Sequence, residues 1–208
     1  MKLTKLLLTA ILVAGAPASV PVFAQPVVGH FISVGVVGGM GVTDAFSNQT
    51  IPGAGASTHL YSRAKDYIVG PSLEVRLPMH LSVEADGLYR PLTQTTTNTV
   101  ASLGTFTTSR TINSWEFPIL AKYKFSMPLV SPFVEAGPSF RHLARFYGDL
   151  LAKAGFTAGV GADLHLGPLH IDPQIRYTRW GSDSNPTSFA PTPQSNANQA
   201  ELLLGISF

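Results

Sequence analysis

Residues 115–125 have the sequence Trp-Glu-Phe-Pro-Ile-Leu-Ala-Lys-Tyr-Lys-Phe. Its charged residues, Glu116, Lys122 and Lys124, share one parity, and the opposite parity is apolar throughout. The apolar positions are Trp115, Phe117, Ile119, Ala121, Tyr123 and Phe125. Successive side chains of a β-strand point to opposite faces of a sheet. The alternation therefore predicts a strand with one apolar face and one charged face.

Seven further segments show this alternation, which makes eight predicted strands. Their apolar positions are Ile32, Val34, Val36, Met40 and Val42; Tyr67, Val69, Leu73 and Val75; Leu81, Val83, Ala85 and Tyr89; Val134, Ala136 and Phe140; Phe156, Ala158, Val160, Ala162 and Leu164; Leu169, Ile171, Ile175 and Tyr177; and Ala200, Leu202, Leu204, Ile206 and Phe208. Residues 93–109 either lengthen the two strands beside them or form another hairpin, which would give ten strands.

The charged residues of these segments fall on the opposite parity. They are Glu74, Arg76, Glu84, Asp86, Glu116, Lys122, Lys124, Glu135, Arg141, Asp163, Asp172, Arg176 and Glu201. Small residues such as Ser33, Gly35 and Gly159 share that face. Acids and bases together with small side chains are typical of a narrow interior with internal ion pairs. We therefore predict a charge network in the lumen of a barrel.

Composition indicates which face points outward. Charged residues make up 12% of the 208 residues, hydrophobic residues 45%, and the mean hydropathy is +0.20. A soluble barrel of the lipocalin type has the same period with its apolar face inside, but its outer face would need more charge than this chain has. The pattern favours an all-β fold, a transmembrane antiparallel up-and-down β-barrel of eight strands.

The connections between the predicted strands alternate in length. Long loops lie near residues 44–66, 91–110 and 181–198, with a shorter one near 147–154, and tight links lie at 78–79, 126–131 and 167–168. Outer-membrane barrels combine short periplasmic turns with longer extracellular loops. This asymmetry gives the barrel an orientation, with both termini on the periplasmic side.

The orientation predicts where aromatic and arginine side chains lie. Two aromatic girdles are expected, Tyr67, Tyr89, Trp115, Phe140, Phe156 and Tyr177 at the outer interface, and Tyr123, Phe125, Phe133 and Phe208 at the periplasmic one. Arg90, Arg110 and Arg179 are expected at the outer rim, because an arginine at the lipid midplane costs roughly 2–4 kcal/mol. Pro71, Pro118, Pro138 and Pro173 lie inside predicted strands, where we expect bulges or strand ends.

Residues 1–24 are predicted to be a secretory signal peptide, which leaves 25–208 as the barrel domain. Lys2 and Lys5 precede the apolar run 6–14, and residues 22–24 offer a cleavage site. The chain has 14 Lys and Arg against 12 Asp and Glu, so loss of the two lysines balances the charge. A balanced charge gives no support for nucleic acid binding. The chain has no cysteine, which excludes disulfides and thiolate metal sites.

The last residues of the chain, 202–208, place Leu204, Ile206 and Phe208 at alternate positions with a terminal aromatic ring. This ending resembles the signal that outer-membrane proteins present to the barrel-assembly machinery. Together with the hairpin spacing, the chain resembles the small OmpA/OmpX-type outer-membrane β-barrel domain family, without a periplasmic peptidoglycan-binding domain. The resemblance implies a location in the bacterial outer membrane, among its lipid and lipopolysaccharide.

Two clusters of polar residues have spacings that a catalytic or metal site could use. His80, Ser82 and Glu84 have a spacing similar to a hydrolase grouping, but we interpret them as a polar turn with lumen contacts. Asp163, His165, His170 and Asp172 flank the tight turn at 167–168 and could hold a divalent ion. We interpret those four as cross-strand hydrogen-bonding residues. No catalytic residue, cofactor site or metal site is predicted.

These features favour a non-enzymatic membrane protein with a structural or surface-interaction role, in which exposed extracellular loops could meet a ligand. The alternative is a narrow pore for small solutes, because eight strands leave an interior that side chains nearly fill. An enzyme that modifies lipid A is the least favoured function.

Overall fold

The computed structural model describes residues 31–53, 56–62, 67–127, 129–143, 152–183 and 196–208. The predicted signal peptide and most of the predicted loops near 147–154 and 181–198 lie outside these residues. The strands are β1 (Ile32–Gly41), β2 (Gln49–Gly53), β3 (Ala56–Ser62), β4 (Tyr67–Arg76), β5 (Leu81–Asp86), β6 (Leu88–Val100), β7 (Gly104–Lys124), β8 (Val130–Leu143), β9 (Ala154–Leu166), β10 (Leu169–Trp180) and β11 (Asn198–Ser207). In the described part of the chain, no helix is long and apolar enough to cross a membrane.

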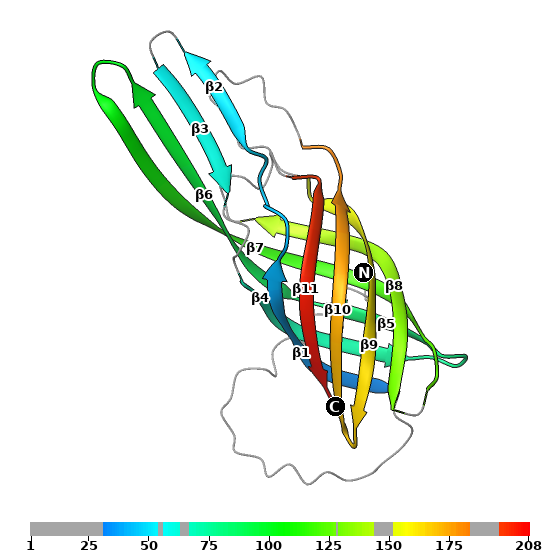
Figure 1. The fold of residues 1–208 in the computed structure, drawn as a ribbon. Coiled ribbons are helices and arrows are strands. Elements are labelled where there is room, and N and C mark those ends of the chain that lie inside the picture. Colours follow the sequence, from blue (N-terminus) through cyan, green and yellow to red (C-terminus); the bar gives the residue numbers. More distant parts are fainter. Residues whose placement is uncertain (1–30, 54–55, 63–66, 128, 144–151, 184–195) are drawn as a thin grey trace, which may run out of the picture.

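The wall of an antiparallel barrel is closed by eight of these strands (Figure 1). The sheet order β1-β11-β10-β9-β8-β7-β5-β4 returns to its start because β4 also pairs with β1. β5 and β6 are successive parts of one long strand, since both pair with β7 in the same register. The predicted all-β, eight-stranded, up-and-down barrel is confirmed.

Gly87 separates β5 from β6, and the neighbouring strand comes very close to it. The Gly87 amide donates to the Pro71 carbonyl oxygen over 3.0 Å. A Cβ on Gly70 would lie 1.9 Å from the carbonyl oxygen of Gly87. Only glycine permits this approach of two backbones, so Gly70 is required for the wall to stay closed here.

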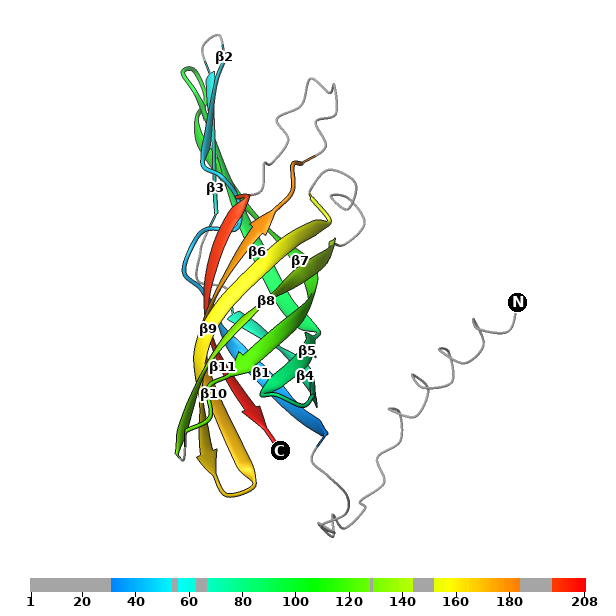
Figure 2. The same cartoon turned by 90° about the vertical axis from the view of Figure 1, so that its right-hand side faces the viewer.

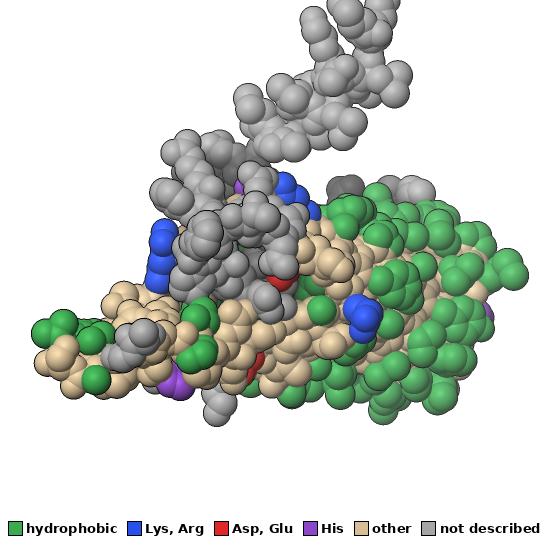
Figure 3. Space-filling model, turned by 90° about the horizontal axis from the view of Figure 1, so that it is seen from above, with side chains coloured by type: hydrophobic (Ala, Val, Ile, Leu, Met, Phe, Trp, Pro, Cys, Tyr) green, Lys and Arg blue, Asp and Glu red, His purple; other side chains and the backbone are tan. Residues whose placement is uncertain are grey.

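The apolar parity faces outward and the charged parity faces the interior. On β5, for example, Leu81, Val83 and Ala85 are exposed, whereas Ser82, Glu84 and Asp86 are buried. Hydrophobic side chains cover the outer wall of the barrel in the space-filling view (Figure 3). This is the reverse of a lipocalin-type barrel, which buries its apolar face.

The hairpin of β6 and β7 runs far beyond the barrel and carries two further strands of the same sheet, β3 and β2 (Figures 1 and 2). β3 pairs with residues 94–100 of β6, and β2 pairs with β3. We call this four-stranded extension (49–53, 56–62, 93–100 and 104–113) the protruding sheet, and the end of the barrel that carries it the loop end. The opposite end, with the turns at 78–80 and 167–168, is the turn end.

The protruding sheet corrects two loop predictions. Residues 44–66 were expected to form a loop but contain β2 and β3, and residues 91–110 lengthen β6 and β7. The added strands lie outside the barrel, so the ten-strand barrel is wrong. Their sequence lacks a regular apolar face because neither side of this sheet covers a barrel interior.

Two turns at the turn end use backbone conformations that restrict the sequence. Met79 and His80 both have positive φ, 67° and 63°, where the Leu77 amide donates to the Leu81 carbonyl oxygen over 2.8 Å. Gly167 has φ 68° and precedes Pro168. Glycine followed by proline suits a two-residue hairpin turn of type II′. This turn makes Leu166 and Leu169 direct register partners.

Prolines within the strands interrupt the ladder without shifting it. The β7–β8 pairing lapses between Pro118↔Ser139 and Ala121↔Ala136, and the register is the same on both sides. The β9–β10 pairing lapses in the same way beside Pro173. The expectation that these prolines need bulges or strand ends is therefore wrong. Each costs local hydrogen bonds, and the flanking pairs hold the register.

Candidate functional site

Arg176 of β10 is the centre of the charged interior. Its Nη1 donates to Asp86 Oδ2 over 2.5 Å, its Nη2 to Glu84 Oε1 over 2.5 Å, and its Nε to Glu135 Oε1 over 2.6 Å. The guanidinium is thus shared among carboxylates of β5 and β8, and its side chain is 1% exposed. A planar guanidinium has five donors in a fixed fork, and this site uses it to join three strands.

Lys122 of β7 extends this cluster toward the turn end. Its ammonium contacts Glu84, and it lies 3.7 Å from Glu135 Oε2 and 3.9 Å from Glu74 Oε2. The same Nζ is 4.3 Å from the ring centroid of Phe133. Phe133 is buried in the interior at 1% exposure, so its predicted place in the periplasmic girdle is wrong. It shares parity with Glu135, and parity decides which face it occupies.

A second cluster lies nearer the loop end, around Arg90 of β6. Its Nη1 lies 2.6 Å from Glu201 Oε1 and 3.8 Å from Glu116 Oε1, and it donates to Gln199 Oε1 over 3.1 Å. Arg90 is buried, so the prediction that it lies at the outer rim is wrong. Its parity matches that of Asp86, which places it inside the barrel among carboxylates. Arg110 and Arg179 are exposed.

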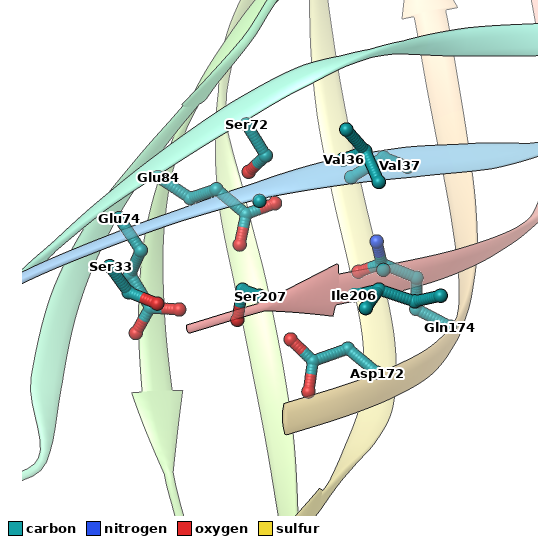
Figure 4. Close-up of a pocket in the computed structure, with 12 residues that line it drawn as sticks. Ser33, Val36, Val37, Ser72, Glu74, Glu84, Asp172, Gln174, Ile206 and Ser207 are labelled. Carbon is teal, nitrogen blue, oxygen red and sulfur yellow. The ribbon is translucent and has the colours of Figure 1, made fainter. Parts of the chain in front are cut away.

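The remaining residues of the predicted network lie beside these two clusters. Arg141 stacks over the Trp180 ring at 4.3 Å and donates to the Ala152 carbonyl oxygen. Lys124 bridges Glu74 and Asp163 at the turn end, and Arg76 lines a cavity there. Asp172, Glu74 and Glu84 line one small interior void (Figure 4). Lys124 is thus paired with two carboxylates, as expected because an unpaired buried charge is costly.

The interior carries more acid than base. Its buried carboxylates are Glu74, Glu84, Asp86, Glu116, Glu135, Asp163, Asp172 and Glu201, whereas its buried bases are Arg90, Lys122, Arg141 and Arg176. Lys124 adds a partly exposed ammonium, 17% exposed. In formal charge, carboxylates therefore exceed bases among the buried residues that the structure describes.

Apolar layers accompany the charges at two heights. Val37, Ile68, Leu88 and Leu203 form one buried cluster. Ala45, Phe46, Leu92, Ile112 and Leu143 form another at the loop end. Two voids beside the ion pairs measure about 10 Å³ each, which is roughly the room needed for one water. The described residues thus pack the lumen with charged and apolar layers.

The residues of the hydrolase-like grouping do not form a hydrogen-bonded chain. His80 Nδ1 lies 3.3 Å from Ser126 Oγ, at an exposed turn. Ser82 Oγ is buried without a hydrogen-bond partner, and Glu84 pairs with Lys122 and Arg176. A nucleophile, a base and an orienting acid need mutual contact. This arrangement gives the interpretation as a catalytic site no support.

The β9–β10 hairpin brings three of its four polar residues together. His170 Nδ1 lies 2.9 Å from Asp163 Oδ1, and His165 Nε2 lies 3.5 Å from Asp163 Oδ2. The two imidazole rings meet edge to face, with centroids 4.7 Å apart. Asp172, the fourth residue, is outside this group. The spacing of these residues around the tight turn predicted that they lie close together. Asp163 points into the barrel, where its carboxylate contacts both histidines.

The outer wall has aromatic contacts near each end. Toward the loop end, the ring centroids of Tyr67 and Tyr89 are 6.2 Å apart, and those of Tyr89 and Trp115 are 5.5 Å apart. Toward the turn end, Tyr123 packs on Phe125 at 5.0 Å. Of the predicted assembly residues, Leu204 and Phe208 are exposed and Ile206 is half-buried on β11. Phe208 is tied to β1 by hydrogen bonds with Val34.

One face of the protruding sheet is a ladder of hydroxyls. The Oγ atoms of cross-strand pairs on β6 and β7 lie 3.1–3.3 Å apart at Thr93–Thr111, Thr95–Ser109, Thr97–Thr107 and Thr99–Thr105. Residues 104–113 of β7 pair with β6 on one side, and the β8 ladder begins only at Ser114. In the described residues, the sheet thus ends in open edges at β2 and β7.

No known protein family matches this chain, and no curated protein is similar to it.

Proposed function

We propose that the chain is an integral outer-membrane protein whose closed barrel anchors the protruding sheet as a binding platform at the cell surface. The observation that carries this proposal is the distribution of side chains on the barrel. Large apolar residues such as Val34, Ile119 and Leu204 are exposed on the wall, while most charged residues of the barrel strands are enclosed. Exposed apolar surface of this extent needs a partner, and lipid covers a closed barrel on all sides.

The aromatic contacts support the same placement. Tyr67, Tyr89 and Trp115 lie toward the loop end of the wall, and Tyr123 and Phe125 toward the turn end. Amphipathic rings at both headgroup layers are typical of membrane barrels. The Tyr89 hydroxyl donates to Asn113 and the Tyr177 hydroxyl to Asn198, as expected for rings with one wet end.

The protruding sheet supplies the interaction role. Its described residues carry one Lys, Arg, Asp or Glu side chain, that of Arg110. Exposed strand edges present unpaired amides and carbonyls that can accept a strand from another chain. The platform therefore suits an extended, uncharged polypeptide more than an anionic polymer. The packed interior supports an anchor, and it lends no support to a pore. Among the described residues, the hydrolase-like grouping lends no support to an enzyme.

Single-cysteine labelling tests the proposal, because the chain has no cysteine of its own. Ser102 is exposed at the tip of the β6–β7 hairpin, and Met79 is exposed at the turn end. In intact cells, a membrane-impermeant maleimide should label Ser102→Cys and should reach Met79→Cys only after lysis. The matched pair differs only in the end of the barrel that carries the thiol.

Migration in detergent gels tests the anchor separately. An intact barrel should migrate differently before and after boiling, and it should stay in the membrane fraction after alkaline extraction. Equal labelling of both cysteines in whole cells would overturn the surface orientation. Recovery of the protein in the aqueous phase without detergent would overturn the membrane location.

A further inference from the structure

Asp163, His165 and His170 offer three metal-ligating atoms within 4.8 Å of one another at the turn end of the barrel. We propose that they bind a divalent transition-metal ion of the zinc type. This site lies at the end opposite the protruding sheet, and the proposal does not depend on the binding role of that sheet.

The separations between the ligating atoms fit a shared ion. His170 Nδ1 and Asp163 Oδ1 are 2.9 Å apart, and His165 Nε2 and Asp163 Oδ2 are 3.5 Å apart. Nitrogen and oxygen ligands lie about 2.0–2.2 Å from zinc. Two ligands of one ion at roughly such distances are about 3–3.5 Å apart in octahedral or tetrahedral geometry. The two separations to Asp163, one to each of its oxygens, are close to those of ligands on one ion, and the three ligating atoms lie within 4.8 Å of one another.

The fold holds these ligands in place before any ion arrives. His165 and His170 are direct register partners on β9 and β10, close to the two-residue turn at Gly167 and Pro168. Asp163 is 1% exposed and receives a hydrogen bond from Lys124 Nζ over 3.0 Å. A hydrogen bond that orients a ligating carboxylate is a usual feature of metal sites.

One nitrogen of this group has no partner. His165 Nδ1 is buried and makes no hydrogen bond, whereas hydrogen bonds satisfy most buried polar atoms. A ring with one nitrogen near Asp163 and the other unpartnered is incompletely satisfied by cross-strand hydrogen bonds alone. The cross-strand interpretation from the sequence leaves this nitrogen unexplained, and the nitrogen placed to ligate is Nε2, on the other side of the ring.

The electrostatic surroundings suit a cation despite the nearby bases. Lys124 is compensated by two carboxylates, Glu74 at 2.9 Å and Asp163 at 3.0 Å. Arg76 also lines the cavity. The buried carboxylates of the barrel interior outnumber the buried bases, and this excess opposes the positive charge of Arg76. Asp163 and Glu74 are the carboxylates nearest to a divalent ion held by the two imidazoles, and they would attract it.

The three ligands leave part of the coordination sphere open toward a cavity. They lie on the wall of a cavity of about 280 Å³ that is also lined by His80, Ser126 and Ser131. Three protein ligands and a remaining accessible position are typical of zinc sites that take a water or a small ligand. His80, on the same wall, belongs to the preferred ligand class of these metals.

Calorimetric titration with zinc chloride tests the proposal on the full chain, folded in detergent and stripped with a chelator. We expect saturable binding of one zinc per chain. His165→Ala and His170→Ala should each weaken binding at least about tenfold, since even partners behind the ligands change affinity that much. His142→Ala, an exposed histidine on β8, should bind zinc like the parent.

Cobalt spectroscopy of the unchanged protein covers the case in which a variant fails to fold. Cobalt(II) should give visible absorption bands and an X-ray absorption shell with imidazole scattering, and zinc should displace it. Absence of saturable zinc binding would overturn the proposal. Unchanged affinity in both variants, equal loss in His142→Ala, or a cobalt shell without imidazole would also overturn it.

Discussion

Arg176 Nη1 donates to Asp86 Oδ2 over 2.5 Å, although β10 and β5 stand on opposite walls of the barrel. Three strands separate them in either direction around the sheet: β9, β8 and β7 on one side, and β11, β1 and β4 on the other. The ion pair therefore spans the full width of the interior. It follows that the lumen is divided by side chains at this height, and the charges brace one wall against the other.

Replacement of Arg176 by leucine should destabilise the barrel strongly. The change leaves Glu84, Asp86 and Glu135 buried without their shared partner, and removal of one member of a buried ion pair costs about 3–5 kcal/mol. Urea-induced unfolding, followed by the gel shift on boiling, measures the loss. Arg179→Leu on the same strand is the control, because Arg179 is exposed and surface changes cost within about 0.5 kcal/mol. Equal midpoints for the two variants would contradict this assignment.

The Arg90–Glu201 pair should show strong coupling. Arg90→Met alone leaves the Glu201 carboxylate buried without the guanidinium that lies 2.6 Å away. We expect a loss of about 3–5 kcal/mol for the single variant, and a smaller loss when Glu201→Leu is added, since apolar replacement of a whole buried pair is often neutral. A double-mutant cycle on unfolding free energies measures the coupling. Additive losses would show that the two side chains do not interact.

Gly70→Ala should prevent the barrel from closing normally. Its new Cβ would lie 1.9 Å from the Gly87 carbonyl oxygen, and backbone must move to relieve the clash. Gly38→Ala is the matched control, because the nearest atom to a Cβ there is Ile68 O at 3.9 Å. The yield of heat-modifiable protein after refolding should fall sharply for the first variant and stay near the parent value for the second. Similar yields would contradict the close approach.

The unmodified protein should not conduct ions in a planar bilayer. Charged side chains meet across the lumen, and Phe46, Leu92 and Ile112 pack together at the loop end. Neither layer leaves a continuous water-filled path among the described residues. Current recordings over a wide voltage range should stay at the level of protein-free membranes. Reproducible steps above that level would instead support the pore as the function.

The protruding sheet should be dispensable for the barrel. Replacement of residues 96–108 by Asn-Gly joins the register partners Thr95 and Ser109 with a turn that suits a two-residue hairpin. The removed residues pair with β3 and with one another rather than with a strand of the barrel wall, so heat-modifiability should persist. The midpoint of urea unfolding should stay within about 1 kcal/mol of the parent. Loss of the folded form would show that the sheet helps to hold the barrel together.

Strict alternation made most of the barrel predictable from the sequence. It gave the eight strands and separated the inward charges from the outward apolar residues, because a closed wall has two environments. Predictions failed where residue type overrode parity. Phe133 was assigned to a girdle and Arg90 to the rim by their chemistry, although both share parity with interior carboxylates. β2 and β3 were missed because Gln49–Gly53 and Ala56–Ser62 lack an apolar face.

The clusters themselves could not be predicted from the sequence. Parity shows that Glu84, Lys122 and Arg176 point inward, but their heights in the lumen depend on strand tilt and on the stagger between strands. The sequence could predict only the grouping of residues beside Gly167, because a tight turn fixes which residues of its two strands lie opposite each other. His165 and His170 are such a pair.

The three-way contact of Arg176 also constrains how this molecule can assemble. Its partners come from β5 and β8, up to 92 residues away in the chain, so no early hairpin can satisfy the guanidinium. In a partly built sheet the guanidinium would lack some of these three carboxylates, and contacts between distant segments form slowly. Assembly of the barrel should therefore be cooperative. Partly assembled sheets should be unstable, and pairing of the last strand should stabilise all the others.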